Sequence, residues 1–388
     1  MSHYMIGWGH TPFGRLRDDD VESLIVRAAT EALADANVTA AEIDAVFVGN
    51  FNSGMNPQEF AASLALQIDD SLRFKPATRV ENACASGSAA LHQGLNYLQA
   101  GLGQRVLVIG VEKMTAASPA QIADGLLGAS YRQEEAATEA GFVGVFARIA
   151  DAYFDRYGDQ SAVLAQIAAK NHANGARNPL AHLRRDFGLD FCRTVSDDNP
   201  IVAGQLKRTD CSPVSDGAAA VVLADTDAIG SARRAVRFRS RVQVNDFLPL
   251  SRRSLIHFEG AAHCWQQAMQ TAGVSLDDLS LLEIHDCFTI AELMLYEALG
   301  LTPIGQGQQA IAEGWVYPDG RLPVNPSGGL KAKGHPVGAT GVSMHVMAAK
   351  QLVGEAGELQ IPDASLAGVF NMGGVAVANY ASILERAA

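Results

Sequence analysis

The chain is poor in charged, aromatic and cysteine residues for its length. Of its 388 residues, 19% are charged and 7% are aromatic, whereas 48% are hydrophobic. This balance excludes a disordered protein and a coiled coil, because both carry more charge and less apolar surface. The 37 glycines are far fewer than a collagen repeat requires. The length instead predicts two or three domains around a large buried core.

Basic residues are also scarce. The chain has 30 Lys and Arg against 42 Asp and Glu, a formal net charge of −12. The negative potential repels nucleic acid and anionic membrane surfaces, so neither is expected as a partner. An anionic small molecule would therefore need a local group of basic residues.

The sequence predicts neither a secretory signal nor a peroxisomal address. Its start has no basic segment followed by the apolar run of a secretory signal, and its last four residues, Glu-Arg-Ala-Ala, differ from a peroxisomal Ser-Lys-Leu address. Residues 364–384 are uncharged and long enough to span a membrane, but Asn371, Asn379 and the Gly373-Gly374 pair favour two buried strands around a glycine turn. We expect no membrane span and a cytoplasmic location.

The five cysteines are odd in number and contain no Cys-x-x-Cys pair. This pattern indicates neither a disulfide framework nor a zinc knuckle, and it fits a reducing compartment. The cysteines are Cys84, Cys192, Cys211, Cys264 and Cys287.

An internal repeat is the most informative feature present. Residues 31–50 align without gaps with residues 267–286, and both read as an amphipathic helix, a short turn and an apolar strand. A second match pairs Cys84-Ala-Ser-Gly87 with His335-Pro-Val-Gly338, each at the start of a helix of small residues. We therefore predict an α/β fold of two similar halves, with mostly parallel sheets and helices on their faces.

The second match places Cys84 and His335 at equivalent points of the two halves, at helix N-termini that face one another. The positive end of a helix is expected to lower the thiol pKa, and a facing imidazole could take the thiol proton. Gly334 and Pro336 would hold the backbone around the imidazole. Without the repeat, a cysteine in such a turn is more often a small buried residue than a nucleophile.

Two further segments could complete a site. His285, Asp286 and Cys287 follow an apolar strand and precede a helix, which is where α/β folds place functional groups. The alternative is a helix cap by Asp286 beside a buried cysteine. Gly373 and Gly374 could bring backbone N–H groups close to an oxyanion, or could simply form a β-turn.

Between the repeats lies an irregular stretch, roughly residues 115–211, with helical segments such as 160–171. It contains four basic residues with no acid among them, and they form either a phosphate-contacting surface or an ordinary solvated helix and loop. They are Lys170, Arg177, Arg184 and Arg185. Arginines at positions 237, 239 and 241 alternate with apolar residues and predict one polar face of a strand.

Four motifs in order resemble the thiolase family, and His-Asp-Cys-Phe is similar to the sterol carrier protein type. The motifs are the turn around Cys84, Ser215-Asp-Gly-Ala-Ala-Ala220, His285-Asp-Cys-Phe288 and Gly334-His-Pro336. The resemblance implies a five-layered α-β-α-β-α fold with two duplicated halves and assembly as a homodimer or homotetramer. Residues 1–115 and 213–240 would form the N-terminal half, 116–212 an inserted loop domain that binds coenzyme A, and 241–388 the C-terminal half.

The resemblance also implies a role for each motif residue. Cys84 would accept the acyl group and His335 would activate it, while His285 and His335 would bind the thioester oxygen and Cys287 would move the proton at the α-carbon. The backbone N–H groups of Cys84 and Gly373 would bind the acyl-enzyme oxygen. Ser212 matches a position that touches pantetheine. Because coenzyme A is anionic, we expect Arg184 and Arg185 to meet its phosphates.

One departure from the family stands out, because many thiolases carry a second reactive cysteine where this chain has Asn371. The resemblance assigns that role to Cys287 instead. It implies an acyltransferase that cleaves 3-oxoacyl-CoA with coenzyme A or runs the reverse condensation, with no metal and no tightly bound cofactor. The alternatives are a related acyltransferase or carbon–carbon lyase with another acceptor and a small accessory protein, and a non-catalytic acyl-CoA or lipid-binding scaffold.

Overall fold

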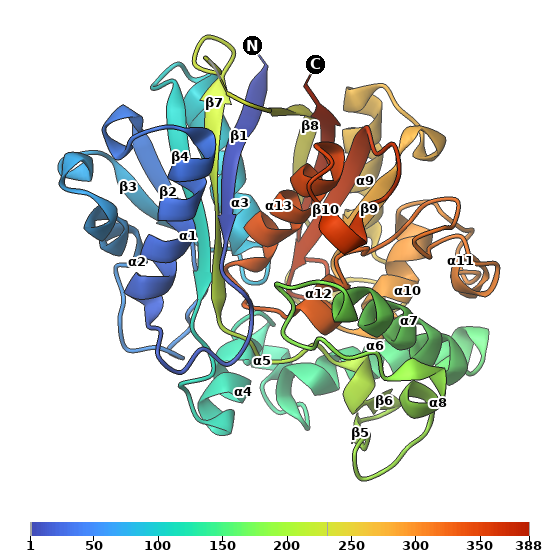
Figure 1. Ribbon diagram of the computed structural model, residues 1–388. Coiled ribbons are helices and arrows are strands. Elements are labelled where there is room, and N and C mark those ends of the chain that lie inside the picture. The colour runs from blue at the N-terminus through green and yellow to red at the C-terminus, as the bar shows by residue number, and fades with distance from the viewer. Residues whose placement is uncertain (1, 231, 388) are drawn as a thin grey trace.

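The computed structural model describes residues 2–230 and 232–387, and its centre is a nine-stranded sheet with the order β3-β2-β4-β7-β1-β8-β11-β10-β9 (Figure 1). β1 and β8 pair through only Tyr4–Arg237 and Met5–Val236, so five strands of one half meet four strands of the other along a short seam. The strands are β1 (His3–His10), β2 (Ala45–Gly49), β3 (Ala77–Val80), β4 (Arg105–Glu112), β7 (Gly217–Asp225), β8 (Val236–Asn245), β9 (Leu281–Ile284), β10 (Leu366–Gly373) and β11 (Ala378–Arg386).

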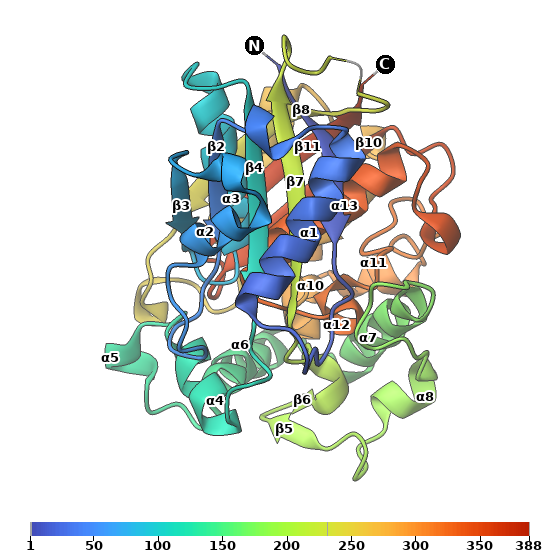
Figure 2. The same ribbon diagram turned by 60° about the vertical axis from the view of Figure 1, so that its left-hand side comes forward.

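The helices divide the fold into five layers. α1 (Val21–Ala36) covers the outer face of the N-terminal strands, and α9 (Glu259–Ala272) covers the outer face of β8 and β11 (Figures 1 and 2). α3 (Ser86–Gln99) and α13 (Thr340–Leu352) lie against each other between the two groups of strands. The layers therefore run α1, sheet, α3 with α13, sheet, α9, as the family resemblance implies.

Both halves use the same strand order, which confirms the duplication. The order β2-β4-β7-β1 in the first half corresponds to the order β9-β10-β11-β8 in the second. The first half adds β3 beside β2, and in the second half a parallel bridge from Leu282 of β9 to Val324 takes the place of β3. The helices of the two repeated units also end in the same way. Asn37 and Gly273, with φ of 54° and 65°, close α1 and α9 in the left-handed conformation that such helix ends favour.

The prediction of mostly parallel sheets was wrong. β2 pairs in parallel with β3 and β4, and β9 with β10, but the other five pairings in the nine-stranded sheet are antiparallel. The reason is visible in the uncharged residues 364–384, where β10 and β11 are joined by only four residues around Gly374. So short a connection can join only antiparallel strands. The stretch does form two buried strands around a glycine turn, as predicted.

The central helices approach each other closely at their N-terminal ends. A Cβ atom on Gly87 would lie 2.7 Å from the carbonyl oxygen of Gly338, and one on Gly341 would lie 2.2 Å from the backbone nitrogen of Ser88. Only glycine allows backbones to meet at these distances. This contact brings the turns before α3 and α13, which carry Cys84 and His335, to the same place.

The remaining elements lie mostly at one end of the sheet (Figure 1). Between β4 and β7 are α4 (Pro119–Leu127), α5 (Arg132–Glu135), α6 (Gly141–Tyr157), α7 (Ser161–Ala176), α8 (Gly188–Arg193), β5 (Ile201–Ala203) and β6 (Leu206–Lys207). The others are α2 (Ala61–Leu64), α10 (Thr289–Ala298), α11 (Gln308–Ala312), α12 (Gly329–Lys333) and short 3-10 turns. Within the described residues, no helix is both long and apolar enough to cross a membrane. The proposed domain boundaries stay predictions.

Candidate active site

Cys84 lies in a sharp turn between β3 and α3. The preceding residue, Ala83, has a φ of 49°, and the Ser86 hydroxyl donates a hydrogen bond of 2.6 Å to its carbonyl oxygen. The same hydroxyl accepts from the backbone N–H of Asn82 at 2.9 Å. A left-handed alanine is strained, and strain of this kind concentrates at functional sites. The turn places the Cys84 side chain at the N-terminal end of α3.

His335 lies in the equivalent turn before α13. Its Nδ1 is 2.6 Å from the hydroxyl oxygen of Thr340, and that hydroxyl donates to the carbonyl oxygen of Pro336 at 3.0 Å. The Thr340 oxygen therefore accepts a hydrogen bond from Nδ1–H, which leaves Nε2 with a free lone pair. Nε2 is buried and has no hydrogen-bond partner among the described residues. This nitrogen is available as a base.

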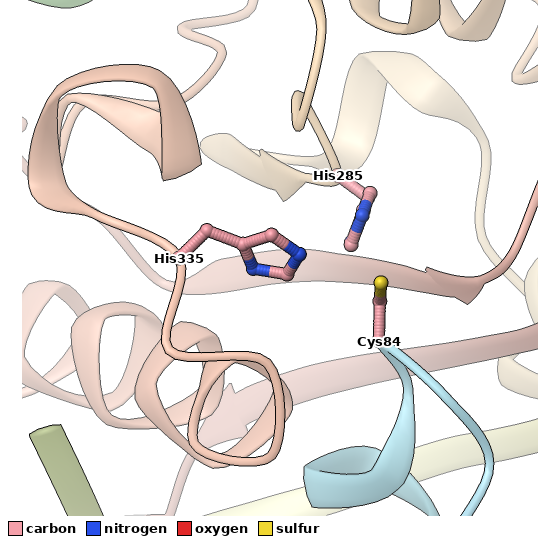
Figure 3. A group of neighbouring side chains, drawn as sticks. All are labelled: Cys84, His285 and His335. Carbon is pink, nitrogen blue, oxygen red and sulfur yellow. The ribbon is translucent and has the colours of Figure 1, made fainter. Parts of the chain in front are cut away.

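Cys84, His285 and His335 come together in one buried group (Figure 3). The sulfur and one ring nitrogen of each histidine all lie within 4.8 Å of one another. The two imidazole rings have centroids 5.2 Å apart and are nearly perpendicular, at 87°. The structure thus brings three of the four predicted catalytic side chains to one point, two from the C-terminal half and one from the N-terminal half.

Burial controls the protonation of this group. It raises the pKa of the Cys84 thiol to about 12, although a hydrogen bond from the Gly374 N–H works in the opposite direction. The expected lowering of this pKa by the helix end was wrong, because desolvation outweighs the partial charge of a helix terminus. Burial, and next the Lys333 charge, lower the pKa of His335 to about 3. The resting site therefore holds a neutral thiol beside a neutral imidazole.

His285 follows β9 directly and lies beside Asn371 of β10. Because Ile284 pairs with Phe370 in parallel, the next residues of the two strands are neighbours. The Asn371 side-chain nitrogen is 2.9 Å from Nδ1 of His285, and Nε2 has no hydrogen-bond partner in the described chain. Burial holds the pKa of His285 well below its ordinary value, so the ring is neutral.

Asp286 holds the segment after β9 against the segment before His335. Its carboxylate accepts from the backbone N–H groups of Leu330 at 2.6 Å and Lys331 at 3.1 Å, at the start of α12. A Cβ on Gly329 would lie 2.2 Å from the same carboxylate. Asp286 is therefore a cap, as one interpretation of the sequence proposed, but it caps α12 rather than the helix that follows it.

Cys287 is buried near Cys84 but outside the group of three. Burial raises the pKa of its thiol well above the ordinary value. Its carbonyl oxygen accepts a hydrogen bond of 2.9 Å from the backbone N–H of Ser212. This contact brings Ser212 to the edge of the site. Its contact with pantetheine and the proton-carrying role of Cys287 stay predictions.

The glycine turn after β10 also reaches Cys84. A Cβ on Gly373 would lie 2.3 Å from the carbonyl oxygen of Asn82, so this glycine packs against the turn that carries the thiol. The backbone N–H groups of Gly374 and of Cys84 itself are hydrogen-bonded to the sulfur, and Gly374 is one residue beyond the predicted oxyanion donor Gly373. Nothing in the sequence distinguishes the two glycines.

The four basic residues between the halves do not form one group. Lys170 is buried and its Nζ lies 2.6 Å from the Glu292 carboxylate, so for this residue both the phosphate-surface and the solvated-surface interpretations were wrong. Arg185 is exposed and lies over the Phe187 ring at 4.8 Å. Arg177 and Arg184 line one cavity of about 270 Å³ with Met347 and Lys350.

That cavity lies by the C-terminal half of α13. Lys350 is ten residues beyond Thr340, which places it about 15 Å along the helix from the end that carries His335. A contact of Arg184 or Arg185 with the phosphates of coenzyme A stays a prediction.

Glu112 joins the two halves beside the site, a role that sequence analysis missed. This buried carboxylate ends β4 and accepts from the side chain of Asn50 at 2.9 Å, and from the backbone N–H groups of Phe51 at 2.9 Å, Asn52 at 3.0 Å and Gly338 at 2.9 Å. Burial raises its pKa to about 7. The signal was an acid directly after the apolar run of β4.

Comparison with known proteins identifies the family. The thiolase N-terminal domain family matches residues 4–187, and the thiolase C-terminal domain-like family matches residues 243–386. The chain belongs to the thiolase family. As predicted, it is an enzyme of the thiolase-type, coenzyme A-dependent acyltransferase class.

Relatives and solved structures agree with this assignment. An acetyl-CoA acetyltransferase of Methanothermobacter thermautotrophicus is 35% identical, covering 95% of this chain and 96% of that protein, and human sterol carrier protein 2 is 30% identical, covering 95% and 69%. Two solved structures share the fold. They are an Ltp2-ChsH2(DUF35) aldolase (TM-score 0.84, 19% identity, 99% and 97% coverage) and the Acat5 thiolase from Ascaris suum in complex with coenzyme A (TM-score 0.75, 17% identity, 100% of both chains).

Proposed function

We propose that this thiolase cleaves 3-oxoacyl-CoA with coenzyme A into acetyl-CoA and a shortened acyl-CoA, or runs the reverse Claisen condensation, through an acyl group on Cys84. The observation that carries the proposal is the group of three, in which a thiol, a free imidazole nitrogen and a second imidazole lie within 4.8 Å of one another. A nucleophile with a base within reach is the arrangement that covalent acyl transfer requires.

The first half-reaction follows from these positions. His335 Nε2 takes the proton of Cys84 as the sulfur attacks the 3-oxo carbon. A sulfur–carbon bond forms, the bond between C2 and C3 breaks, and its electron pair leaves as the enolate of acetyl-CoA. A proton from Cys287 to C2 then completes acetyl-CoA.

The second half-reaction regenerates the thiol. The Cys287 thiolate takes the thiol proton of coenzyme A as its sulfur attacks the acyl carbon on Cys84. The bond between that carbon and the Cys84 sulfur breaks, and the sulfur regains the proton that His335 holds. Oxyanion donors would stabilise both steps. The backbone N–H groups of Cys84 and Gly373 or Gly374 would hold the acyl oxygen, and His285 and His335 would hold the oxygen of the acetyl-CoA thioester or enolate.

Thiolysis of acetoacetyl-CoA by the purified chain alone tests this reaction. We expect loss of acetoacetyl-CoA and formation of two acetyl-CoA only when coenzyme A is present, and no reaction with Cys84→Ala. A series of longer 3-oxoacyl-CoA substrates in the same assay gives the chain-length preference. Absence of turnover with every chain length would contradict the proposal.

A carbon–carbon lyase with a small accessory protein is the second candidate. It is supported by the fold shared with the Ltp2-ChsH2(DUF35) aldolase at a TM-score of 0.84. The buried thiol and base favour thiolysis instead, because a lyase that forms no acyl-enzyme needs no such pair. Thiolysis by the chain without a partner would count strongly against the lyase.

Assembly and setting are predictions of the same proposal. We expect a homodimer or homotetramer and a cytoplasmic location. Sedimentation of the purified chain measures the assembly state. Fatty acid or lipid metabolism is the setting that 3-oxoacyl-CoA substrates indicate.

A further inference from the structure

The group of three has the composition of a metal site. Cysteine sulfur and two histidine nitrogens are common ligands of zinc, and the three atoms lie close enough together to share one ion. The Nε2 atoms of both histidines are buried and have no hydrogen-bond partner among the described residues. An imidazole nitrogen binds a metal only through a free lone pair. The tautomer of each histidine therefore decides what this group can do.

Asn371 determines the tautomer of His285. The Asn371 side chain is fully buried, its oxygen accepts from the Ser88 hydroxyl at 2.8 Å, and its nitrogen lies 3.3 Å from the carbonyl oxygen of Cys84. A carbonyl oxygen can only accept hydrogen bonds, so the atom that faces it must be the amide nitrogen. The orientation of the amide thus follows from its chemical surroundings.

The same amide nitrogen lies 2.9 Å from Nδ1 of His285. Because an NH₂ group only donates, Nδ1 must be the acceptor and the ring proton must lie on Nε2. His335 has the opposite arrangement, since Thr340 accepts from its Nδ1 and leaves Nε2 free. Of the two neighbouring imidazoles, His285 therefore carries a proton on Nε2 and His335 carries a lone pair there.

We infer that Asn371 is a positioning residue that holds His285 in the Nε2–H tautomer, so that this imidazole donates a hydrogen bond and cannot serve as a base or a metal ligand. The donor role toward a thioester oxygen rests on the proposed function, whereas the tautomer and the metal behaviour do not. Asn371 stands where many thiolases carry a reactive cysteine. Here it contributes to the site by orienting its neighbour.

The metal behaviour gives a test that is independent of turnover. In Asn371→Asp, a carboxylate would accept from Nδ1–H and leave a lone pair on Nε2. Carboxylate–histidine–metal arrangements of this kind change metal affinity 10- to 100-fold. We expect Asn371→Asp to bind Zn²⁺ at least about 10-fold more tightly than the unmodified chain in equilibrium dialysis with metal analysis. Co²⁺ should give a thiolate charge-transfer band only in the variant.

Asn379→Ala is the matched control. Asn379 is also fully buried, on the neighbouring strand β11, and its amide donates to the carbonyl oxygen of Ala376 at 2.9 Å rather than to His285. Its loss should leave zinc affinity unchanged. Equal zinc affinity of the unmodified chain and Asn371→Asp would overturn the inference.

Nitrogen NMR of histidine-labelled protein tests the tautomer without any dependence on folding of the aspartate variant. The signal of His285 is assigned by its loss in His285→Gln. We expect a protonated Nε2 and a bare Nδ1 in the unmodified chain, and a new Nδ1–H population in Asn371→Ala. A protonated Nδ1 in the unmodified chain would overturn the inference directly.

Kinetics then connect the tautomer to the reaction. Loss of one oxyanion donor lowers turnover by about 10²- to 10³-fold, and a mixed tautomer should lose part of that, so we expect kcat of Asn371→Ala to fall on the order of 10- to 100-fold with KM little changed. Unchanged kcat together with the altered NMR signal would refute the donor role and leave the tautomer assignment standing.

Discussion

The two halves share an element order and a strand order but differ in how they hold their reactive side chains. In the N-terminal half, Cys84 lies in a tight turn next to α3, a helix whose first residues are small. In the C-terminal half, His335 and His285 lie near buried ionisable groups, including Lys333 and the Asp286 cap on α12. Duplication thus brought two helix ends together, and divergence gave one a nucleophile and the other a base.

The two reactive side chains also differ in the direction in which burial shifts their pKa values. Burial raises the pKa of Cys84 to about 12 and lowers the pKa of His335 to about 3. Transfer of the thiol proton to the imidazole is therefore unfavourable in the resting site. We expect it to occur together with attack on the substrate, when oxyanion donors stabilise the new charge.

Replacement of Cys84 should have the largest effect on thiolysis, because Cys84 is the nucleophile that the N-terminal half contributes to the site. We expect Cys84→Ser to lower kcat/KM for thiolysis by about 10⁴-fold or more, since a buried serine is a far weaker nucleophile. Cys192→Ser is the control, because Cys192 is equally buried but lies on α8. Comparable losses in both variants would contradict the assignment of Cys84.

Separation of the N-terminal ends of α3 and α13 should have the next largest effect on activity. A methyl group at Gly341 would lie 2.2 Å from the backbone nitrogen of Ser88, so Gly341→Ala must push α13 away from α3. We expect about 10- to 100-fold lower kcat and about 1–3 kcal/mol lower free energy of unfolding. Gly94→Ala on α3 would instead meet side chains of the sheet and should leave kcat nearly unchanged.

Removal of the Lys333 charge should shift the pH profile of acylation. The neutral base form of His335 is present above its pKa, and both burial and Lys333 lower that pKa. In Lys333→Met we expect the pKa to rise toward the ordinary value, so the acylation rate should begin to fall at a higher pH as the solution is acidified. Lys331→Met is the control, because Lys331 is also buried on α12 but does not act on His335. Identical acid limits in the unmodified chain and Lys333→Met would contradict the role of this charge.

Removal of both exposed arginines of the inserted segment should have the smallest effect. Exposed ion pairs contribute about 0.2–1 kcal/mol each, so the double variant Arg184→Ala, Arg185→Ala should raise KM for coenzyme A by about threefold to tenfold with kcat unchanged. Arg233→Ala, an exposed arginine paired with Glu355, is the control. An unchanged KM would make the two arginines ordinary solvated surface.

The internal repeat made much of the fold predictable. It located Cys84 and His335 at equivalent turns, and helix-strand periodicity located the repeated units of α1 and α9. The parallel sheet assignment failed because strand direction follows from connections, and the short turn around Gly374 permits only an antiparallel return.

The site was predictable in its residues but not in its chemistry. Motif residues identified Cys84, His285 and His335, yet the direction of the Cys84 pKa shift depends on burial, which long-range packing creates. The partners that set the histidine tautomers, Thr340 and Asn371, are ordinary polar residues. Thr340 lies only five residues from His335, whereas the hydrogen bonds of Asn371 form only once β9, β10 and α3 lie side by side.

Acyl transfer to Cys84 tests the central claim most directly. The chain is incubated with acetyl-CoA, and intact-mass and peptide analysis follow the adduct over time in the unmodified chain and in His335→Gln. We predict one acetyl group on Cys84 in the unmodified chain. In His335→Gln, which lacks the imidazole base, the acetyl group should form at least about 10²-fold more slowly. An acetyl group on another residue, or equal rates in the two proteins, would contradict the account.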